Sequence, residues 1–257
     1  MHKYTIGEIM DIACRAGKII LENGGEIYRV EDTMLYVCKA FGISDCECYA
    51  TPTTIIISVI DAHGEVFSRM MRIRERGVNL LKVEAVNNFS RKILQEPITV
   101  AEAKQKLREI ENIPTYNLPT IVLAVALGTA SFAIILGGNW LHFICGFVTG
   151  ALLRLVIIYL NRIQLGFFTV NLFGGVGAAL GGWLLMHLGI LPEWRVITLS
   201  TVMQLVPGLI FTNALRDAAA GDLVSAISRG TEAFSIVTAL ACGAGATLMV
   251  LCWLGGM

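Results

Sequence analysis

Charge is distributed unevenly along this chain, and no other feature constrains its fold as strongly. Residues 1–117 contain 15 Lys or Arg and 16 Asp or Glu, whereas residues 118–257 contain only 5 and 4. About a quarter of the residues in a typical soluble domain are charged, so the second part is too apolar for an ordinary soluble fold. We therefore predict an α+β cytoplasmic N-terminal domain over residues 1–117 and an all-α membrane domain over residues 118–257.

The membrane domain is expected to contain five transmembrane helices, because a spanning helix needs about 20 mostly apolar residues. The qualifying segments are residues 119–136, 140–160, 165–188, 196–214 and 233–254. Charges interrupt the N-terminus, which does not resemble a signal peptide, so we expect it to stay in the cytoplasm. The connections that contain Arg162, Arg216 and Arg229 then face the cytoplasm, as the positive-inside rule requires. The expected location is the cell membrane (inner or plasma membrane), multi-pass, with the C-terminus outside.

Local signals in the first domain predict helices and a short antiparallel sheet. Capping boxes at Thr5–Glu8 and Thr99–Glu102 mark two helix starts. A β-branched run predicts one strand, in which Pro52 requires an edge position or a strand start, and a tight hairpin connection leads to a second strand. The expected helices cover residues 5–22, 26–41, 80–95 and 99–111, and the expected strands cover residues 49–61 and 65–74.

The most unusual segment is QLVPGLIFTNALRDAAAGD at residues 204–222. It is apolar enough for a membrane helix, yet Pro207 cannot donate a hydrogen bond to the carbonyl of Met203, and Gly208 weakens the next turn. In a membrane, the freed carbonyl groups need a partner or a water-lined cavity. Gln204, one turn before the proline, is the expected partner. The sequence therefore predicts a discontinuous fourth span, of the kind that binds substrates in secondary transporters.

Polar residues follow this break on single helical faces. Asn213, Arg216 and Asp217 lie at positions i, i+3 and i+4, and Gly221 followed by Asp222 is expected to end one helix and cap the next. The residues of the next stripe, which leads into the fifth span, are Asp222, Ser225, Arg229 and Glu232. We interpret both faces as a polar cavity in which a guanidinium binds a substrate carboxylate and an acidic residue binds an ammonium group or carries a proton. The alternative is a kinked helix followed by a cytoplasmic loop with solvated charges.

Two further polar residues fall inside spans. Arg154 lies within the second span, where a charge costs on the order of 3 kcal/mol and is expected to face the bundle interior. The alternative is that its side chain extends to the membrane interface. Asn171 precedes Gly174 and Gly175 in the third span, where we expect a loosened helix beside a substrate pathway.

The first domain offers one other candidate site, at the start of the second helix. Glu26, Arg29 and Asp32 lie close to one face, and Glu31 flanks them. Tyr28 belongs to the same group and is expected on the apolar stripe of this helix. The alternative is a surface ion-pair ladder that stabilises the helix only slightly.

Several classes of function lack support in the sequence. The chain contains no Walker-type phosphate-binding loop, and no nucleophile–base pair accompanies the charged residues, so we expect no catalytic residue, no cofactor and no enzyme activity. Cys46 and Cys48 are the only close cysteines, and no second pair completes a metal site. The net charge of zero gives no reason to expect nucleic-acid binding.

Three stretches together resemble the threonine/serine exporter (ThrE) family. They are ENGGEIYRVEDTM at 22–34, TPTTIIISV at 51–59 and VPGLIFTNALRDAAAGDLVSAISRGTEA at 206–233. The likeness is strongest to the short first component of the two-protein YjjP/YjjB succinate exporters. It implies a cytoplasmic domain, five spans and export of small polar metabolites. Full-length members carry a second membrane region, so a separate small membrane protein is the expected partner, with or without oligomerisation.

We therefore predict an integral membrane subunit of a secondary exporter. The expected substrates carry a carboxylate and are either threonine/serine-type amino acids or dicarboxylates such as succinate. The alternative function is a membrane-anchored sensor or enzyme whose activity lies in the N-terminal domain.

Overall fold

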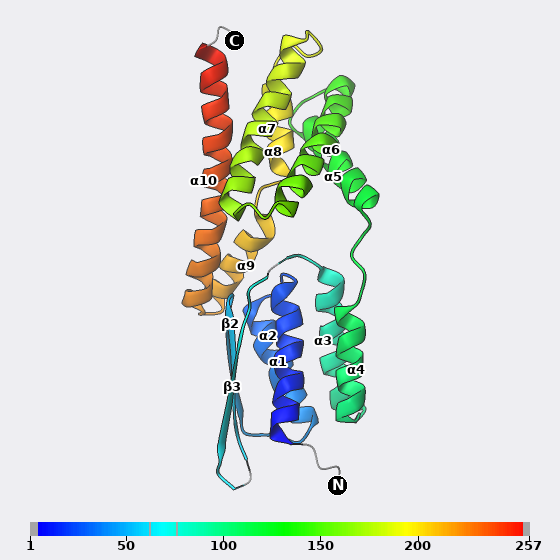
Figure 1. Ribbon diagram of the computed structural model, residues 1–257, viewed down its shortest axis with the longest axis vertical. Helices are drawn as coiled ribbons and strands as arrows, with labels where there is room; N and C mark the ends of the chain where they lie inside the picture. The colour runs from blue at the N-terminus through cyan, green and yellow to red at the C-terminus, as the bar shows by residue number, and fades with distance from the viewer. Residues whose placement is uncertain (1–4, 62, 76, 254–257) are drawn as a thin grey trace. The chain divides into compact units, whose positions relative to one another are not determined.

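The computed structural model describes residues 5–61, 63–75 and 77–253 (Figure 1). The chain divides into two compact units. The first consists of Met1–Thr115 with Leu209–Gly230, and the second of Tyr116–Gly208 with Thr231–Met257. The expected membrane domain therefore contributes one segment, Leu209–Gly230, to the unit formed by the N-terminal residues.

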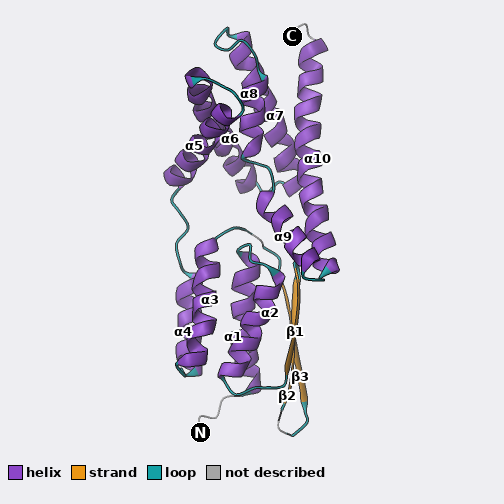
Figure 2. Ribbon diagram, turned by 180° about the vertical axis from the view of Figure 1, so that it is seen from behind, coloured by secondary structure: helices purple, strands orange, loops and turns teal. Residues whose placement is uncertain are grey.

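The first unit is built in three layers. A three-stranded sheet is covered on one face by two helices, α1 and α2, and a second helix pair, α3 and α4, packs on the far side of them (Figure 2). Its elements are α1 (Ile6–Glu22), α2 (Ile27–Ala40), β1 (Cys46–Thr51), β2 (Thr54–Ile60), β3 (Val66–Arg72), α3 (Leu80–Gln95) and α4 (Val100–Glu111). Nearly all of α9 (Gly208–Ala219) and the beginning of α10 (Leu223–Trp253) also belong to this unit.

The predicted helix ends are confirmed where side chains cap them. Thr5 with Glu8 and Thr99 with Glu102 form the expected capping boxes at the starts of α1 and α4. A box of this kind satisfies backbone N–H groups that have no partner within the helix. The four helices predicted for this part of the chain are present and nearly where expected.

The sheet differs from the prediction at Pro52. Residues 49–61 do not form one strand, because Pro52 and Thr53 turn the chain and Thr51 pairs directly with Thr54. Proline has no N–H to donate and a fixed φ, which suits a turn better than the interior of a ladder. The sheet is antiparallel in the order β1-β2-β3, and the second predicted strand is confirmed as β3.

The core of the first unit lies between the sheet and the helices. Alternate residues of β2, namely Ile55, Ile57 and Val59, point inward and are at most 1% exposed. They pack in one cluster with aliphatic side chains of α1 and α2, such as Ile12 and Val30. This burial holds the loop between α1 and α2 in a defined position, which matters for the site described below.

The second unit contains the apolar helices. Its elements are α5 (Leu118–Ile135), α6 (Trp140–Arg162), α7 (Phe167–His187), α8 (Arg195–Met203) and the part of α10 from residue 231. Among the described residues, four helices are long and apolar enough to span a membrane, or up to five if α8 and α9 form one bent span. A helix as short as α8, with nine residues, rises only about 14 Å, less than half of a ~30 Å hydrocarbon core. The predicted helix break at Pro207-Gly208 is confirmed, and it covers residues 204–207.

Glycines allow close packing in the second unit. Gly146 and Gly150 on α6 lie against Thr129, Ala130 and Ala133 of α5, as expected for a small-xxx-small pattern. Gly175 of α7 lies directly against the backbone of α10. The expected loosening of α7 at Gly174-Gly175 is wrong, because the helix continues from Phe167 to His187 and both glycines serve as contact points.

Candidate functional site

The site is centred on the short loop that joins α1 to α2. Helix α1 ends at Glu22, and the side chain of Asn23 donates a hydrogen bond to the Ile19 carbonyl at 2.7 Å. Gly24 has a φ of 88°, and a Cβ on Gly25 would collide with Ile20. Only glycine fits such positions easily, so the Gly24-Gly25 pair makes a tight turn that presents two backbone carbonyls.

Side chains from α9 and α10 bind these carbonyls. The Asn213 amide donates to the Gly24 carbonyl at 3.0 Å, and the Arg229 guanidinium donates to the Gly25 carbonyl at 2.8 Å. Both side chains are buried, with exposed fractions of 2% and 7%. Two stretches about 190 positions apart, each singled out in the sequence, thus meet within the first unit.

Ion pairs connect the same two stretches. Glu26 is 7% exposed; one of its oxygens accepts a hydrogen bond from Arg216 at 2.5 Å, and the other forms an ion pair with Arg29 at 2.6 Å. Deeper in the unit, Asp217 pairs with Arg229 at 3.2 Å. Buried charges are stable only when paired and hydrogen-bonded, and this arrangement alternates the signs so that each named charge has an opposite neighbour.

Asp217 has a second role at the start of α2. Its carboxylate accepts from the backbone N–H of Ile27, the first residue of that helix. A negative group at a helix N-terminus is favoured by the helix dipole and by the unpaired N–H groups there. Asp217 of α9 therefore fixes the end of α2 that carries Glu26.

A cavity of about 360 Å³ opens beside this network. Its lining includes Gly24, Gly25, Glu26, Arg29, Leu80, Val83, Glu84, Asn87, Leu209, Asn213 and Arg216. The Arg216 side chain is 56% exposed, although one of its nitrogens contacts Glu26. Guanidinium groups bind carboxylates bidentately, and acidic side chains such as Glu84 suit an ammonium group. The cavity thus has the chemistry for a small anionic or zwitterionic molecule.

The remaining candidates of the first unit have structural positions. Asp222 accepts from the Ser225 N–H at 3.1 Å, which confirms the predicted cap of the last helix. Glu31 accepts from the Ala50 N–H at 2.9 Å, tying α2 to β1, and burial raises the pKa of its carboxyl group. Asp32 is exposed. Tyr28 is 42% exposed and lies under the Arg29 guanidinium, so its expected place on the apolar stripe is wrong.

The candidates of the second unit and of the last span are more dispersed. Both polar atoms of the Gln204 amide, and Nε of Arg154, are buried without a hydrogen-bond partner among the residues that the structure describes. The expected pairing of Gln204 with the freed carbonyl of Met203 is therefore wrong; the Val206 N–H approaches that carbonyl instead, at 3.4 Å. Asn171 donates to the Phe167 carbonyl of its own helix. Among the remaining predicted site residues, Pro207 is buried, Gly208 begins α9, and Glu232 is half-buried on α10.

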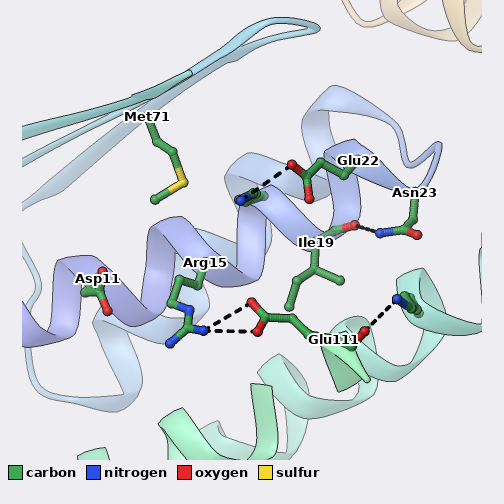
Figure 3. A pocket seen from close by; sticks show the side chains of 9 residues that line it. Asp11, Arg15, Ile19, Glu22, Asn23, Met71 and Glu111 are labelled. Atoms are coloured by element: carbon green, nitrogen blue, oxygen red, sulfur yellow. Dashed lines mark hydrogen bonds and ion pairs between the residues drawn. The ribbon is translucent and has the colours of Figure 1, made fainter. Parts of the chain in front are cut away.

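A larger hollow of about 540 Å³ lies elsewhere in the first unit, between α1, α3 and α4 (Figure 3). Its basic groups already have partners. Arg15 pairs with Glu111 at 3.0 Å, Lys18 with Glu22 at 3.6 Å, and Lys82 donates to the Glu111 carbonyl at 2.6 Å. The hollow thus lies between helix layers that are joined by ion pairs. Because its basic groups are already paired, we do not assign the substrate to it.

Sequence reasoning missed several parts of the site. It considered Glu26 and Arg216 separately and had no means to pair them, and it did not consider Glu84 or Asn87 of α3. The glycine pair between Asn23 and Glu26 was a usable signal, because it marks a place where backbone carbonyls become accessible to side chains.

Comparisons with known proteins agree with this picture. The "Putative threonine/serine exporter" family model (ThrE) matches residues 11–251. A "Probable threonine/serine exporter" of Mycobacterium tuberculosis is 24% identical over 92% of this chain and 45% of its own length. The "Threonine/serine exporter" of Corynebacterium glutamicum is 25% identical over 95% of this chain and 51% of its own length.

The chain thus spans about half the length of these two relatives. It covers 86% of a third, the "Probable succinate transporter subunit YjjP" of Klebsiella aerogenes, which is 23% identical over 87% of this chain. No solved structure matches the chain. Since the family model covers almost the whole sequence and includes every part of the site, the chain belongs to the threonine/serine exporter family.

Proposed function

We propose that this chain is the membrane subunit of a secondary exporter of small, polar, carboxylate-bearing metabolites. The relatives support this proposal, since two are named as threonine/serine exporters and one as a succinate transporter subunit. The candidate substrates are accordingly threonine/serine-type amino acids and dicarboxylates such as succinate. Both classes need a cationic group for a carboxylate, and the cavity beside Arg216 and Arg29 supplies two.

The observation that carries the proposal is the shared use of Glu26 by Arg216 and Arg29. One buried carboxylate holds two guanidinium groups at the edge of a cavity. A substrate carboxylate is a chemically equivalent partner and can replace Glu26 on Arg216. Binding then replaces the Glu26–Arg216 ion pair with a substrate–Arg216 ion pair, and Glu26 keeps Arg29 as its partner. Because no charge is left unpaired, the free-energy cost of the exchange is low.

The connection of α9 to the spans suggests how binding is coupled to transport. Helix α9 follows the break at residues 204–207, and α10 continues without interruption from the first unit into the last span. A change in the Glu26–Arg216 contact therefore acts on helices that enter the membrane. In this scheme the buried, unpartnered groups of Arg154 and Gln204 line the route through the second unit.

We further propose a topology and a partner. Residues 1–117 lie in the cytoplasm, the fourth span covers residues 196–214 and contains the break at 204–207, five spans result, and the C-terminus lies outside. A second small membrane protein completes the transporter, in keeping with the word "subunit" in the name of the relative that this chain covers almost fully. An ion gradient drives export, since one charge crossing 100 mV provides about 2.3 kcal/mol.

The test is metabolite efflux from cells that express the chain, alone and with a candidate partner. Arg216→Ala should reduce efflux by about 10-fold or more, because losing a charged hydrogen bond costs about 1.5–3 kcal/mol. Arg216→Lys should retain part of the activity, since lysine keeps the charge but not the bidentate geometry. Arg195→Ala, at the start of α8, is the matched control and should leave efflux unchanged.

The same assay separates this proposal from a membrane-anchored sensor or enzyme. An anchored sensor or enzyme loses all function when residues 1–112 are deleted, but its expression leaves metabolite efflux unchanged, whether or not a partner is present. Efflux of amino acids and dicarboxylates that does not change in any combination of chain and partner would overturn the exporter proposal.

A further inference from the structure

Three cysteine sulfurs meet at the inner face of the sheet, on the side away from the candidate site. Cys38 comes from the last turn of α2, and Cys46 and Cys48 come from β1, where alternation turns both toward the core. The Cys46 sulfur lies 3.4 Å from that of Cys38 and 3.8 Å from that of Cys48. We call these three residues the thiol triad.

The three thiols differ in how readily they ionise. The contacts with Cys38 and Cys48 lower the pKa of Cys46, whereas the contacts with Cys46 raise the pKa values of Cys38 and Cys48. Cys46 is therefore the first of the three to become a thiolate, the reactive form of cysteine. It is also partly exposed, while Cys38 is fully buried.

We propose that the thiol triad is an oxidation site, in which Cys46 is the reacting residue, Cys38 its disulfide partner and Cys48 the exchange partner. A hydroperoxide first oxidises the Cys46 thiol to a sulfenic acid, and its O–O bond breaks to release water or an alcohol. The Cys38 sulfur then attacks the Cys46 sulfur, an S–S bond forms, the S–OH bond breaks, and the oxygen leaves as water. The peroxide gains the two electrons that the two thiols lose.

The geometry favours this bond over the other pairs. A disulfide needs the two sulfurs at about 2.05 Å, so the Cys38 and Cys46 sulfurs, already in van der Waals contact, need to approach by little more than 1 Å. Cys48 can afterwards attack the Cys46 sulfur and release Cys38, which makes the bond exchangeable. A metal site is less well supported, because no group of three or more ligands with metal-binding geometry occurs in the described part of the chain.

The bond would tie the end of α2 to the start of β1. These two elements are already joined by the hydrogen bond between Glu31 and Ala50. Glu26 lies at the other end of α2, so oxidation would restrain the helix whose first residues contribute to the candidate site. The proposal itself does not depend on what the chain transports.

The experiment uses the full-length protein purified in detergent and treated with equimolar hydrogen peroxide. Free thiols are then blocked, and tryptic peptides are mapped by mass spectrometry without reduction. Cleavage after Arg29, Lys39 and Arg69 places Cys38 in the peptide 30–39 and Cys46 with Cys48 in the peptide 40–69. The expected product is a disulfide between these two peptides, with loss of two free thiols per chain.

Single variants assign the roles. Cys46→Ser should abolish the cross-link, Cys48→Ser should retain it, and Cys38→Ser should divert the bond to a loop within peptide 40–69. Cys14→Ser is the matched control and should have no effect, since burial raises the pKa of Cys14 to about 11 and keeps it protonated.

Three results would overturn the proposal. They are peroxide treatment that leaves peptides 30–39 and 40–69 unlinked, a cross-link that persists in Cys46→Ser, and a stoichiometric zinc ion that protects all three thiols in the purified protein. None of these results depends on efflux, so the oxidation site and the exporter function are tested separately.

Discussion

The two compact units differ in the size of the side chains that they bury completely. In the first unit many of the fully buried residues are large, such as Ile12, Ile20 and Leu107, whereas in the second they are mostly alanines, including Ala126 and Ala178. The large apolar residues of the second unit lie on its surface; Phe234, for example, is 72% exposed.

The difference reflects the solvent that each unit is built for. Water drives large apolar side chains inward. Lipid is as apolar as leucine, so helices in a bilayer associate through close packing of small residues instead. The inverted burial pattern is thus independent physical support for a membrane location of the second unit.

The largest expected effect is truncation of a side chain in the core of the first unit. Ile12→Ala should lower the free energy of unfolding by about 2–5 kcal/mol, because it removes buried methyl groups and leaves a cavity. Leu152→Ala, at a position 58% exposed on α6, should have little effect on folding of the helix bundle. Thermal denaturation in detergent measures the stability of both variants. Equal losses of stability would contradict the proposed difference between a core of large residues in the first unit and exposed large residues in the second.

The next largest effect is expected from the opposite substitution, which adds a methyl group where small residues pack in the second unit. A Cβ on Gly243 of α10 would collide with the backbone of α7 at Leu172, so Gly243→Ala should destabilise the bundle by about 1–3 kcal/mol. Gly245→Ala, two residues along the same helix, meets open space and should be neutral or slightly stabilising. Melting temperatures in one detergent compare the pair, and similar values would mean that close packing is not what holds α7 against α10.

A smaller effect is expected where α10 begins, in the first unit. Asp222→Ala should destabilise the protein by about 1 kcal/mol, since the Ser225 N–H loses its acceptor. Asp222→Asn keeps the acceptor and should behave nearly like the wild type. Hydrogen exchange at the first turn of α10 reports the change locally, and equal protection in the two variants would show that the cap is dispensable.

The smallest effect concerns pH. Burial raises the pKa of Glu31, so the folded state holds the proton to a higher pH than the unfolded state does. The contribution of this group to stability is therefore greatest below its ordinary pKa of 4.5 and declines as the pH rises through the raised value.

Glu31→Gln should remove this decline while keeping an acceptor for the Ala50 N–H. Its melting temperature should equal or slightly exceed that of the wild type near pH 7, and the two should converge toward pH 4. A variant that is less stable than the wild type at neutral pH would show that the negative charge itself stabilises the α2–β1 contact.

Local features were predictable from the sequence because they depend on near neighbours. The capping boxes at Thr5 and Thr99, the break at Pro207 and the cap at Asp222 each need only a few adjacent residues. The division into a charged and an apolar part followed from composition. The turn at Pro52 was missed because the β-branched residues that flank it favour a strand more strongly than a single proline opposes one.

The candidate site was only half predictable. Both contributing stretches were singled out, one for its charges and one for its break and polar face. Nothing in the spacing of residues showed that Glu26 pairs with Arg216 or that Arg229 binds the Gly25 carbonyl, because such contacts join positions about 190 to 204 apart.

The order of residues along the chain was enough to specify helix ends, apolar segments and the residue types available for a site. Those properties depend on backbone sterics, hydrogen bonding within one or two turns, and preference for water or lipid. The pairing of buried charges, the cavity beside Arg216 and the meeting of three sulfurs arose only in the folded protein. Each of them requires surfaces from distant segments to come together, and the free energy that selects one such arrangement belongs to the packed unit as a whole.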